Sequence, residues 1–283
     1  MNDTTSNPTA VVTGAFDNVK TADIRFLQEA SKTGHLQILL YSDDLYSSCY
    51  GKLPKFPVAE RKYFLESIRY VNGVKVIESR EDRSIISNWN EIKKNNASQI
   101  TWVVNEEENK PDLNALCSNN GVGYQVVLND QIKGFPLEAP YSADAHTGKK
   151  VVVTGSFDWM HSGHVRFFEE ASEWGDLFAI VGHDANIKLL KGEGHPLFSQ
   201  DERRYLVQSV RFVKQALISS GHGWMDAEPE INLIKPDFYV VNEDGDKPEK
   251  SVFCKEHGIE YKVLKRLPKP GLPRRESTAL RGF

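Results

Sequence analysis

Cysteine is scarce in this chain of 283 residues, which contains three, Cys49, Cys117 and Cys254. Their spacing matches no zinc-binding motif, and an odd number argues against a framework of disulfides. Cys117 and Cys254 also occupy equivalent positions of an internal repeat, described below. We therefore expect Cys117 and Cys254 to be buried packing residues of a protein in a reducing compartment.

A strong charge imbalance and long apolar runs are also missing. The 35 Lys and Arg residues nearly balance the 39 Asp and Glu residues, so the net charge of −4 does not indicate a general binder of polyanions. No apolar run approaches membrane-spanning length. The polar opening Met1–Ala10 lacks the features of a secretory signal. These absences, with 40% hydrophobic and 26% charged residues, predict an ordinary globular protein in the cytoplasm without membrane insertion.

The most informative stretch that is present is VVVTGSFDWMHSGH, residues 151–164. Its β-branched start predicts a buried strand, and a glycine turn leads to two histidines where an amphipathic helix begins. The start of a helix favours anions, because its backbone N–H groups and its dipole point there. His161 and His164 could donate hydrogen bonds to phosphate oxygens at that point. The alternative is that they only cap the helix, which the Gly155-x-Phe157-Asp158 lead disfavours.

The pattern G-x-F-D-x-x-H-x-G-H over residues 155–164 resembles the signature of the HxGH nucleotidyltransferase superfamily, especially its cytidylyltransferase-like branch. The similarity continues through most of residues 150–281. The resemblance implies a nucleotide site in which the two histidines bind the α- and β-phosphates. The residues it implicates in this turn are Gly155, Phe157, Asp158, His161, Gly163 and His164.

The whole chain repeats this unit. The matching stretches, in the same order, are 12–17 with 153–158, 25–31 with 166–172, 60–64 with 202–206, 103–106 with 240–243, and Cys117 and Gly121 with Cys254 and Gly258. So many ordered matches indicate two tandem copies of one α/β unit. We expect a first domain at residues 1–135, a linker at 136–149 and a second domain at 150–283.

The two copies differ where the chemistry is expected. Lys20 stands at the position of His161, and Asp23 at the position of His164. An aspartate there would repel the phosphates that a histidine could bind. The first domain is therefore expected to be degenerate and inactive. The tandem layout resembles that of ethanolamine-phosphate cytidylyltransferase. That family keeps histidines in its first copy. The similar layout therefore does not imply that this chain acts on the same substrate.

Strand-like and helical patterns alternate, which predicts a Rossmann-like, doubly wound parallel sheet in each copy. Ligands of such sheets bind beyond the carboxyl ends of the strands. In the second copy the expected strands are 150–155, 177–182, 214–218, 238–242 and 260–264, and the expected helices are 162–174, 200–211, 227–234 and 247–257.

Further candidates follow the second and third strands of this copy. Asp184 and Lys191 match the acidic residue and lysine that the family carries on this loop, where a mobile lysine could reach the α-phosphate. A solvated surface loop is the alternative. Arg203 matches a family Glu-Arg pair and could either brace the sheet or contact the acceptor. Trp224 matches a tryptophan that lines the family's acceptor pocket and would suit a cationic head group, although a lone Trp more often packs.

The closing segment, residues 274–281, resembles the family's final motif, in which arginines and a helix-opening serine hold the outer phosphates. The resemblance assigns this role to Arg274, Arg275, Ser277 and Thr278. Further basic residues lead up to the segment, namely Lys262, Lys265, Arg266 and Lys269. A solvated basic tail is the alternative. Contact with nucleic acid is disfavoured, since aromatic residues for base stacking are missing. The loop 242–246 departs from the pattern that the family has near the nucleotide. The sequence therefore does not identify the base of the nucleotide.

Together these features predict a nucleotidyltransferase, most simply one that transfers CMP from CTP to a small phosphorylated or phosphonate acceptor. An adenylyltransferase acting on a sugar phosphate or a cofactor precursor is the first alternative, and a nucleotide sensor without turnover is the second. Mg²⁺ is expected to be bound mainly by the triphosphate, with no protein metal site, while Asp158 orders the turn or holds a water on the ion. No nucleic-acid partner is expected, and a homodimer remains open.

Overall fold

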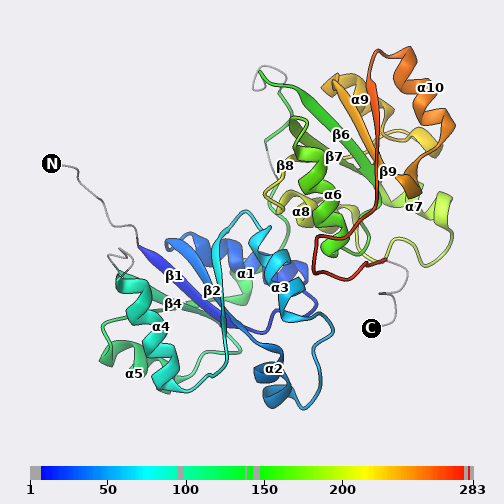
Figure 1. Cartoon of the computed structure of the whole chain (residues 1–283). Helices are drawn as coiled ribbons and strands as arrows, with labels where there is room; N and C mark the ends of the chain where they lie inside the picture. Colours follow the sequence, from blue (N-terminus) through cyan, green and yellow to red (C-terminus); the bar gives the residue numbers. More distant parts are fainter. Residues whose placement is uncertain (1–7, 95–98, 138, 143–146, 277–279, 281–283) are drawn as a thin grey trace. The chain divides into compact units, whose positions relative to one another are not determined.

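The computed structural model describes residues 8–94, 99–137, 139–142, 147–276 and 280 (Figure 1). The chain divides into two compact units, Met1–Gly134 and Phe135–Phe283. Each unit holds one five-stranded parallel sheet between helices. This confirms the predicted fold class of two tandem Rossmann-like, doubly wound sheets. Among the described residues, no helix is long and apolar enough to cross a membrane.

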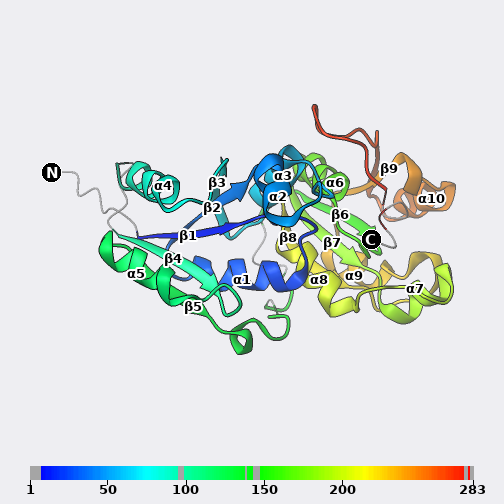
Figure 2. The ribbon, with the colours of Figure 1, turned by 90° about the horizontal axis from the view of Figure 1, so that it is seen from below.

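The first unit has the strand order β3-β2-β1-β4-β5. Figure 2 shows α1 and α4 on opposite sides of this sheet. Its elements are β1 (Thr9–Gly14), α1 (Thr21–Ser31), β2 (His35–Tyr41), α2 (Asp43–Tyr50), α3 (Val58–Glu66), β3 (Val71–Ile77), α4 (Asp82–Lys94), β4 (Ile100–Asn105), α5 (Pro111–Asn119), β5 (Gly123–Val127) and the 3₁₀ turn η1 (Asn129–Ile132).

The second unit has the order β10-β9-β6-β7-β8, the same arrangement in its own count. Its elements are β6 (Lys150–Gly155), α6 (Ser162–Ser172), β7 (Asp176–Val181), α7 (Asp184–Lys191), α8 (Gln200–Gln208), β8 (Val213–Ile218), η3 (Gly223–Met225), α9 (Glu228–Ile234), β9 (Phe238–Asn242), η4 (Glu243–Gly245), α10 (Pro248–Glu256) and β10 (Glu260–Leu264). The strand order reverses between β6 and β9, and ligands of such sheets bind at this switch point.

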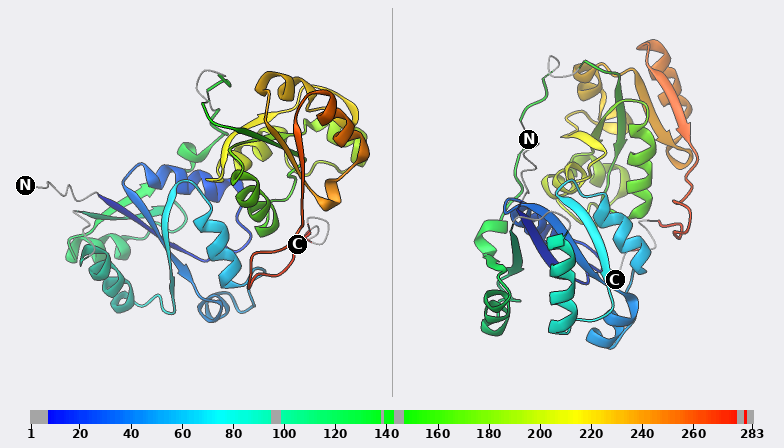
Figure 3. Two further views of the ribbon diagram at one scale, coloured as in Figure 1. Left: turned by 45° about the horizontal axis from the view of Figure 1, so that its top comes forward. Right: turned by 60° about the vertical axis from the view of Figure 1, so that its left-hand side comes forward.

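The central strands β6, β7 and β9 of the second unit are mostly apolar because helices cover both faces of the sheet, whereas the edge strands β8 and β10 carry polar residues such as Lys214 and Lys262. Alternate residues point to opposite faces. Val152, Phe178 and Tyr239 pack with residues of α9 and α10 in one core cluster. After β10 the chain turns back along α6, as Figure 3 shows, and this return brings the basic C-terminal segment to the start of that helix.

The strands begin and end within one residue of the predicted bounds, but the segment after β7 differs from the prediction. It was expected as a loop and forms the helix α7. His183 caps this helix by accepting the backbone N–H of Asn186 at 3.2 Å. Asn186 is fully buried and exchanges hydrogen bonds with Gly223. The two hydrogen bonds between Asn186 and Gly223 join residues that are 37 positions apart, so a local sequence pattern could not reveal them.

The segment expected as a linker packs in part on the second unit. The ring of Phe135 lies 5.8 Å from that of Tyr205. Arg204 donates to the carbonyl of Pro136 at 3.0 Å. Tyr141 meets Phe178 edge to face. The unit boundary accordingly falls between residues 134 and 135.

A buried arginine ties the carboxyl edge of the second sheet together. Arg203, only 1% exposed, donates through Nε to the carbonyl of Phe198 at 2.9 Å and through Nη1 to that of Ser156 at 2.6 Å. Its Nη2 donates to the carbonyl of Gly182 and to the carboxylate of Asp184, both at 2.7 Å. One guanidinium thus connects the turn after β6, the end of β7 and the start of α7.

The first unit repeats this brace. Arg61 donates to the carbonyls of Phe56 and Ala15 and to the carboxylate of Asp43, at 2.9, 2.5 and 2.7 Å. The repeat shows that the brace is part of the shared scaffold. It also favours the bracing role for Arg203 over contact with an acceptor.

Replacing Arg203 by Met should lower the free energy of unfolding of the second unit by about 3 kcal/mol, because buried oxygens lose a charged donor. Urea unfolding followed by circular dichroism measures the change. Lys214→Ala, which removes an exposed pair with Asp176, is the control and should change stability by less than about 0.5 kcal/mol. An equal effect of both variants would contradict the brace.

Candidate active site

The turn after β6 is held in a strained shape by an aromatic ring. Phe157 has a positive φ of 47°, and Phe16 has 46° at the equivalent position of the first unit. A Cβ on Gly155 would lie 2.9 Å from the Phe157 ring, so only glycine leaves room for it. The buried ring of Phe157 then packs edge-on to His164, with ring centroids 5.7 Å apart. The Phe157 ring therefore supports one side of the His164 ring.

His161 is the N-cap of α6 and is 3% exposed. Its Nδ1 accepts the backbone N–H of Gly163 at 3.0 Å. A neutral imidazole that accepts at Nδ1 carries its proton on Nε2, so Nε2 is a hydrogen-bond donor. Gly163 is required for this contact, because a Cβ there would lie 2.8 Å from Cε1 of the ring.

His164 stacks beside His161, with ring centroids 4.1 Å apart. Burial lowers the pKa of His161 to about 3, with smaller effects from Arg266 and Arg275. Burial, the neighbouring His161 and nearby cations hold the pKa of His164 well below its usual value. Both rings are therefore neutral at pH 7, so they bind anions as hydrogen-bond donors. Nδ1 of His164 is buried without a partner among the described residues.

Cations from distant segments surround the histidine pair. Lys191, in the last turn of α7, donates to Oγ of Ser156 in the turn after β6 at 2.8 Å. It is near enough to His164 to lower the pKa of that ring. Arg266 lies two residues beyond β10 and affects both histidines, while Arg275 affects His161. The structure thus brings the predicted catalytic trio of His161, His164 and Lys191 together.

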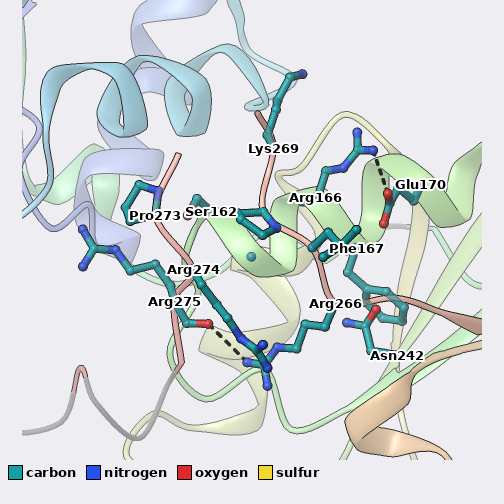
Figure 4. Close-up of a pocket in the computed structure, with 13 residues that line it drawn as sticks. Ser162, Arg166, Phe167, Glu170, Asn242, Arg266, Lys269, Pro273, Arg274 and Arg275 are labelled. Atoms are coloured by element: carbon teal, nitrogen blue, oxygen red, sulfur yellow. Dashed lines mark hydrogen bonds and ion pairs between the residues drawn. The ribbon is translucent and has the colours of Figure 1, made fainter. Parts of the chain in front are cut away.

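A basic pocket lies between α6 and the C-terminal segment (Figure 4). Figure 4 shows the side chains of Arg266 and Arg274 converging, with Asn242 from the end of β9 beside Arg266. Arg266 also donates to the backbone carbonyl of Arg275 at 3.3 Å. The lining residues are Ser162, Gly163, Arg166, Phe167, Glu170, Asn242, Arg266, Leu267, Pro268, Lys269, Pro273, Arg274 and Arg275. Such a surface suits a polyphosphate.

Acidic side chains of the second unit hold several of these cations in place. Arg166 pairs with Glu169 at 3.0 Å and with Glu170 at 2.6 Å. Lys269 reaches the other oxygen of Glu169 at 2.8 Å. Arg266 pairs with Asp244 at 2.6 Å, whereas the side chain of Arg274 is mostly exposed. The carboxylates therefore orient this basic group at the pocket.

Asp158 and Asp184, both expected at the nucleotide, take part in the scaffold. Oδ1 of Asp158 accepts the backbone N–H groups of Leu197 and Phe198 at 2.7 and 3.2 Å. Asp184 is the carboxylate partner of Arg203. Of the two roles expected for Asp158, the geometry supports ordering the turn.

Trp224, expected at the acceptor, lies in η3 and is 50% exposed. The loop that carries it is held to α7 through Asn186 and Gly223. It stays a candidate for the rim of an acceptor site. Ser277 and Thr278 lie outside the described residues, so their assignment remains a prediction.

Sequence reasoning gave no role to three residues that the fold places at the pocket. Arg266 and Lys269 were counted only as part of a basic stretch, and Arg166 was used only as a repeat marker. For Arg266 and Lys269 the available signal was the comparison of the copies, whereas Arg166 gave none because Arg25 stands at its position in the first copy. Two residues beyond the last strand of each unit, Asn129 stands in the first copy where Arg266 stands in the second.

Several charged or histidine groups of this site are replaced in the described part of the first unit, although Arg25, paired with Glu29 at 3.1 Å, keeps the position of Arg166. Asp23 accepts the backbone N–H of Lys20 at 2.7 Å, so it caps its own helix. Tyr50 ends α2 where Lys191 ends α7, since both helices have eight residues. With Tyr50 and Asn129 in place of Lys191 and Arg266, two of the cations beside the second unit's histidines are replaced by uncharged residues in the first unit.

A phosphate-binding turn at the switch point of a Rossmann-like sheet is the arrangement of a nucleotide-binding transferase. A family model described as cytidylyltransferase-like matches residues 152–252. The chain belongs to this family, within the HxGH nucleotidyltransferase superfamily.

Individual relatives align with about half of the chain. An FAD synthase of Aciduliprofundum boonei is 36% identical over 125 residues, which is 43% of this chain and 80% of that protein. The bifunctional protein HldE of Aliarcobacter butzleri is 36% identical over 140 residues, 48% of this chain. The match covers only 28% of the length of HldE. A lipopolysaccharide core biosynthesis protein of Thermoplasma volcanium has a similar structure, with 23% identity over 46% of this chain and all of that chain, at a TM-score of 0.36.

Gly163→Ala should displace the His161 ring and lower the rate of nucleotidyl transfer by about 10²-fold, as misplaced catalytic groups commonly do. Pyrophosphate release measures the effect. Gly148→Ala is the matched control, since nothing lies within 4 Å of a Cβ at that position. Equal rates in the two variants would show that the close contact with His161 has no catalytic role.

Acid should destabilise the second unit through His161. The pKa of His161 is about 3 in the folded state and 6.5 for an exposed imidazole, so between these pH values the unfolded state binds a proton that the folded state does not bind. The free energy of unfolding should then fall by about 1.4 kcal/mol per pH unit from this group as the pH drops from 6.5 towards 3. Urea unfolding at pH 5.5 and 4.5 should show a shallower fall in His161→Asn than in the unchanged protein. Parallel slopes would contradict the neutral ring.

Proposed function

We propose that the second unit transfers a nucleotidyl group from a nucleoside triphosphate to a small phosphorylated or phosphonate acceptor. An acceptor oxygen attacks the α-phosphorus in line and forms the new P–O bond. The bond to the bridging oxygen of the β-phosphate breaks, and pyrophosphate leaves with its electron pair. The attacking oxygen is already anionic, so no strong protein base is needed. Catalysis consists of positioning and charge stabilisation.

The observation that carries this proposal is a pair of neutral, buried histidines beside Lys191 at the switch point. Nε2–H of His161 donates to a phosphate oxygen, and His164 binds the same group from the next turn of the helix. Because both rings are neutral, the positive charge comes from Lys191, Arg266 and Arg275. Donors fixed before the reaction stabilise the charge that develops in the transition state.

The residues of the site suit Mg²⁺ only as an ion carried by the triphosphate. Within the described residues, no group of three or more His, Cys, Asp or Glu side chains could hold a metal ion. Oδ1 of Asp158 is occupied by two backbone N–H groups. When bound, the ion neutralises phosphate charge, while Lys191 and the arginines contact the remaining oxygens.

The base of the nucleotide has two candidates. CTP follows from the resemblance of the turn to the cytidylyltransferase-like branch. ATP is supported by the similarity to an FAD synthase over 80% of that protein, because FAD contains an adenylate group. Asn242, at the end of β9 in the basic pocket, is placed to contact the nucleotide in either case.

His164→Ala should lower kcat by about 10²-fold without unfolding the protein, because a donor to the transition state is lost. The measurement is pyrophosphate release with Mg²⁺, either CTP or ATP, and a panel of phosphorylated alcohols and sugars. The triphosphate that supports release identifies the base.

Asp23→Ala is the internal control, since it changes the equivalent position of the first unit. It should leave the rate unchanged. A loss of activity in Asp23→Ala, or full activity in His164→Ala, would move the reaction away from the second unit. Tight binding of a triphosphate without turnover on any acceptor would instead favour a sensor.

A further inference from the structure

A polar cluster lies at the carboxyl edge of the second sheet, on the face covered by α9 and α10. Thr154 directly precedes the phosphate-binding turn, and its Oγ1 lies 2.7 Å from the hydroxyl of Tyr239. Lys250, the third residue of α10, places its ammonium 5.7 Å from the centre of the Tyr239 ring. These groups lie on the face of the sheet that α9 and α10 cover, and Thr154 is next to Gly155 of the turn.

Lys250 is half-buried yet has little to bind. Nζ donates to the carbonyl of Gly245 at 3.1 Å. An ammonium can donate three hydrogen bonds. Among the described residues, the structure gives Lys250 the one to Gly245. Burial, together with Lys247, lowers the pKa of Lys250. A partly desolvated ammonium with open donors costs stability unless a ligand satisfies it.

The first unit shows that the fold does not need this lysine. Leu113 is the third residue of α5, as Lys250 is of α10, and it packs against an apolar core cluster. Trp102 stands where Tyr239 stands. Oγ1 of Thr13, the counterpart of Thr154, is consequently buried without a partner among the described residues. The inactive copy has therefore lost the Lys–Tyr pair along with the histidines.

Asp226 supplies an acceptor on the same edge. Its Oδ2 accepts the hydroxyl of Ser219 at 2.6 Å and would lie 3.4 Å from a Cβ on Gly182 at the end of β7. Together with Asp246, which has a larger effect, Asp226 partly opposes the lowering of the Lys250 pKa by burial, and it makes a small contribution to the raised pKa of Tyr239. No ion pair joins Asp226 to Lys250 in the described part of the chain. A hydroxyl-bearing ligand could accept from the ammonium and donate to the carboxylate.

We propose that Lys250, Asp226 and the Thr154–Tyr239 pair form a subsite for the hydroxyl groups of a polyol or sugar phosphate acceptor. The proposal rests on the proposed function and narrows its substrate class. An ammonium so placed repels a cationic head group, because like charges at short range in a partly buried site interact strongly. We therefore expect amino-alcohol phosphates to bind more weakly than polyol or sugar phosphates. Trp224 then serves as an apolar wall for a sugar ring.

The test is calorimetric titration of the full chain, saturated with a non-hydrolysable triphosphate analogue. The panel consists of glycerol 3-phosphate, hexose 1-phosphates, phosphoethanolamine and phosphocholine. A polyol or sugar phosphate should bind at least about tenfold more tightly than the two amino-alcohol phosphates. Lys250→Met should weaken that binding by about tenfold or more, as loss of a charged hydrogen bond does.

Lys250→Arg retains the charge and should retain most of the affinity, whereas Lys255→Met, on an exposed part of the same helix, should change nothing. In turnover, Lys250→Met should raise KM for the acceptor with kcat nearly unchanged. Tighter binding of an amino-alcohol phosphate, an unchanged affinity in Lys250→Met, or no binding by any panel member would overturn the subsite. Binding of the triphosphate, titrated alone against His164→Ala, tests the proposed function separately.

Discussion

One buried guanidinium in each unit fixes the edge on which the active site depends. A charge removed from water must have its donors satisfied, and Arg203 meets this need with the carbonyl of Phe198, with carbonyls from the turn after β6 and from Gly182 just after β7, and with the carboxylate that starts α7. The positions of the histidine turn and of Lys191 follow from that requirement. Arg203 therefore fixes the turn after β6 and the start of α7 relative to each other.

Comparing the two units separates the residues of the shared scaffold from those of the proposed site. The brace, the strained phenylalanine and the strand order occur in both. The histidine pair, Lys191 and Arg266 occur only in the second unit, where the first has Lys20, Asp23, Tyr50 and Asn129. Lys250 and Tyr239 follow the same pattern, since Leu113 and Trp102 stand at their positions in the first unit.

The strands and the histidine turn could be predicted because their signals are local: a β-branched run, a glycine that clears an aromatic ring, and the start of an amphipathic helix. α7 could not, since its cap and its buried Asn186 depend on a loop 37 residues away. Arg266 and Lys250 were missed for a related reason. Each is an ordinary surface-type residue in the sequence, and only the folding of the chain brings it to the carboxyl edge of the sheet.

The central claim is that neutral His161 and His164 bind the phosphates of a nucleoside triphosphate. Nitrogen-15 NMR of the histidine side chains, recorded during titration with CTP and with ATP, tests it directly. The account predicts that both rings are neutral at pH 7, with the proton of His161 on Nε2. It also predicts that these two, among the eight histidines, shift most when the nucleotide binds. Protonated rings in the free protein, or nucleotide binding that leaves both signals in place, would contradict it.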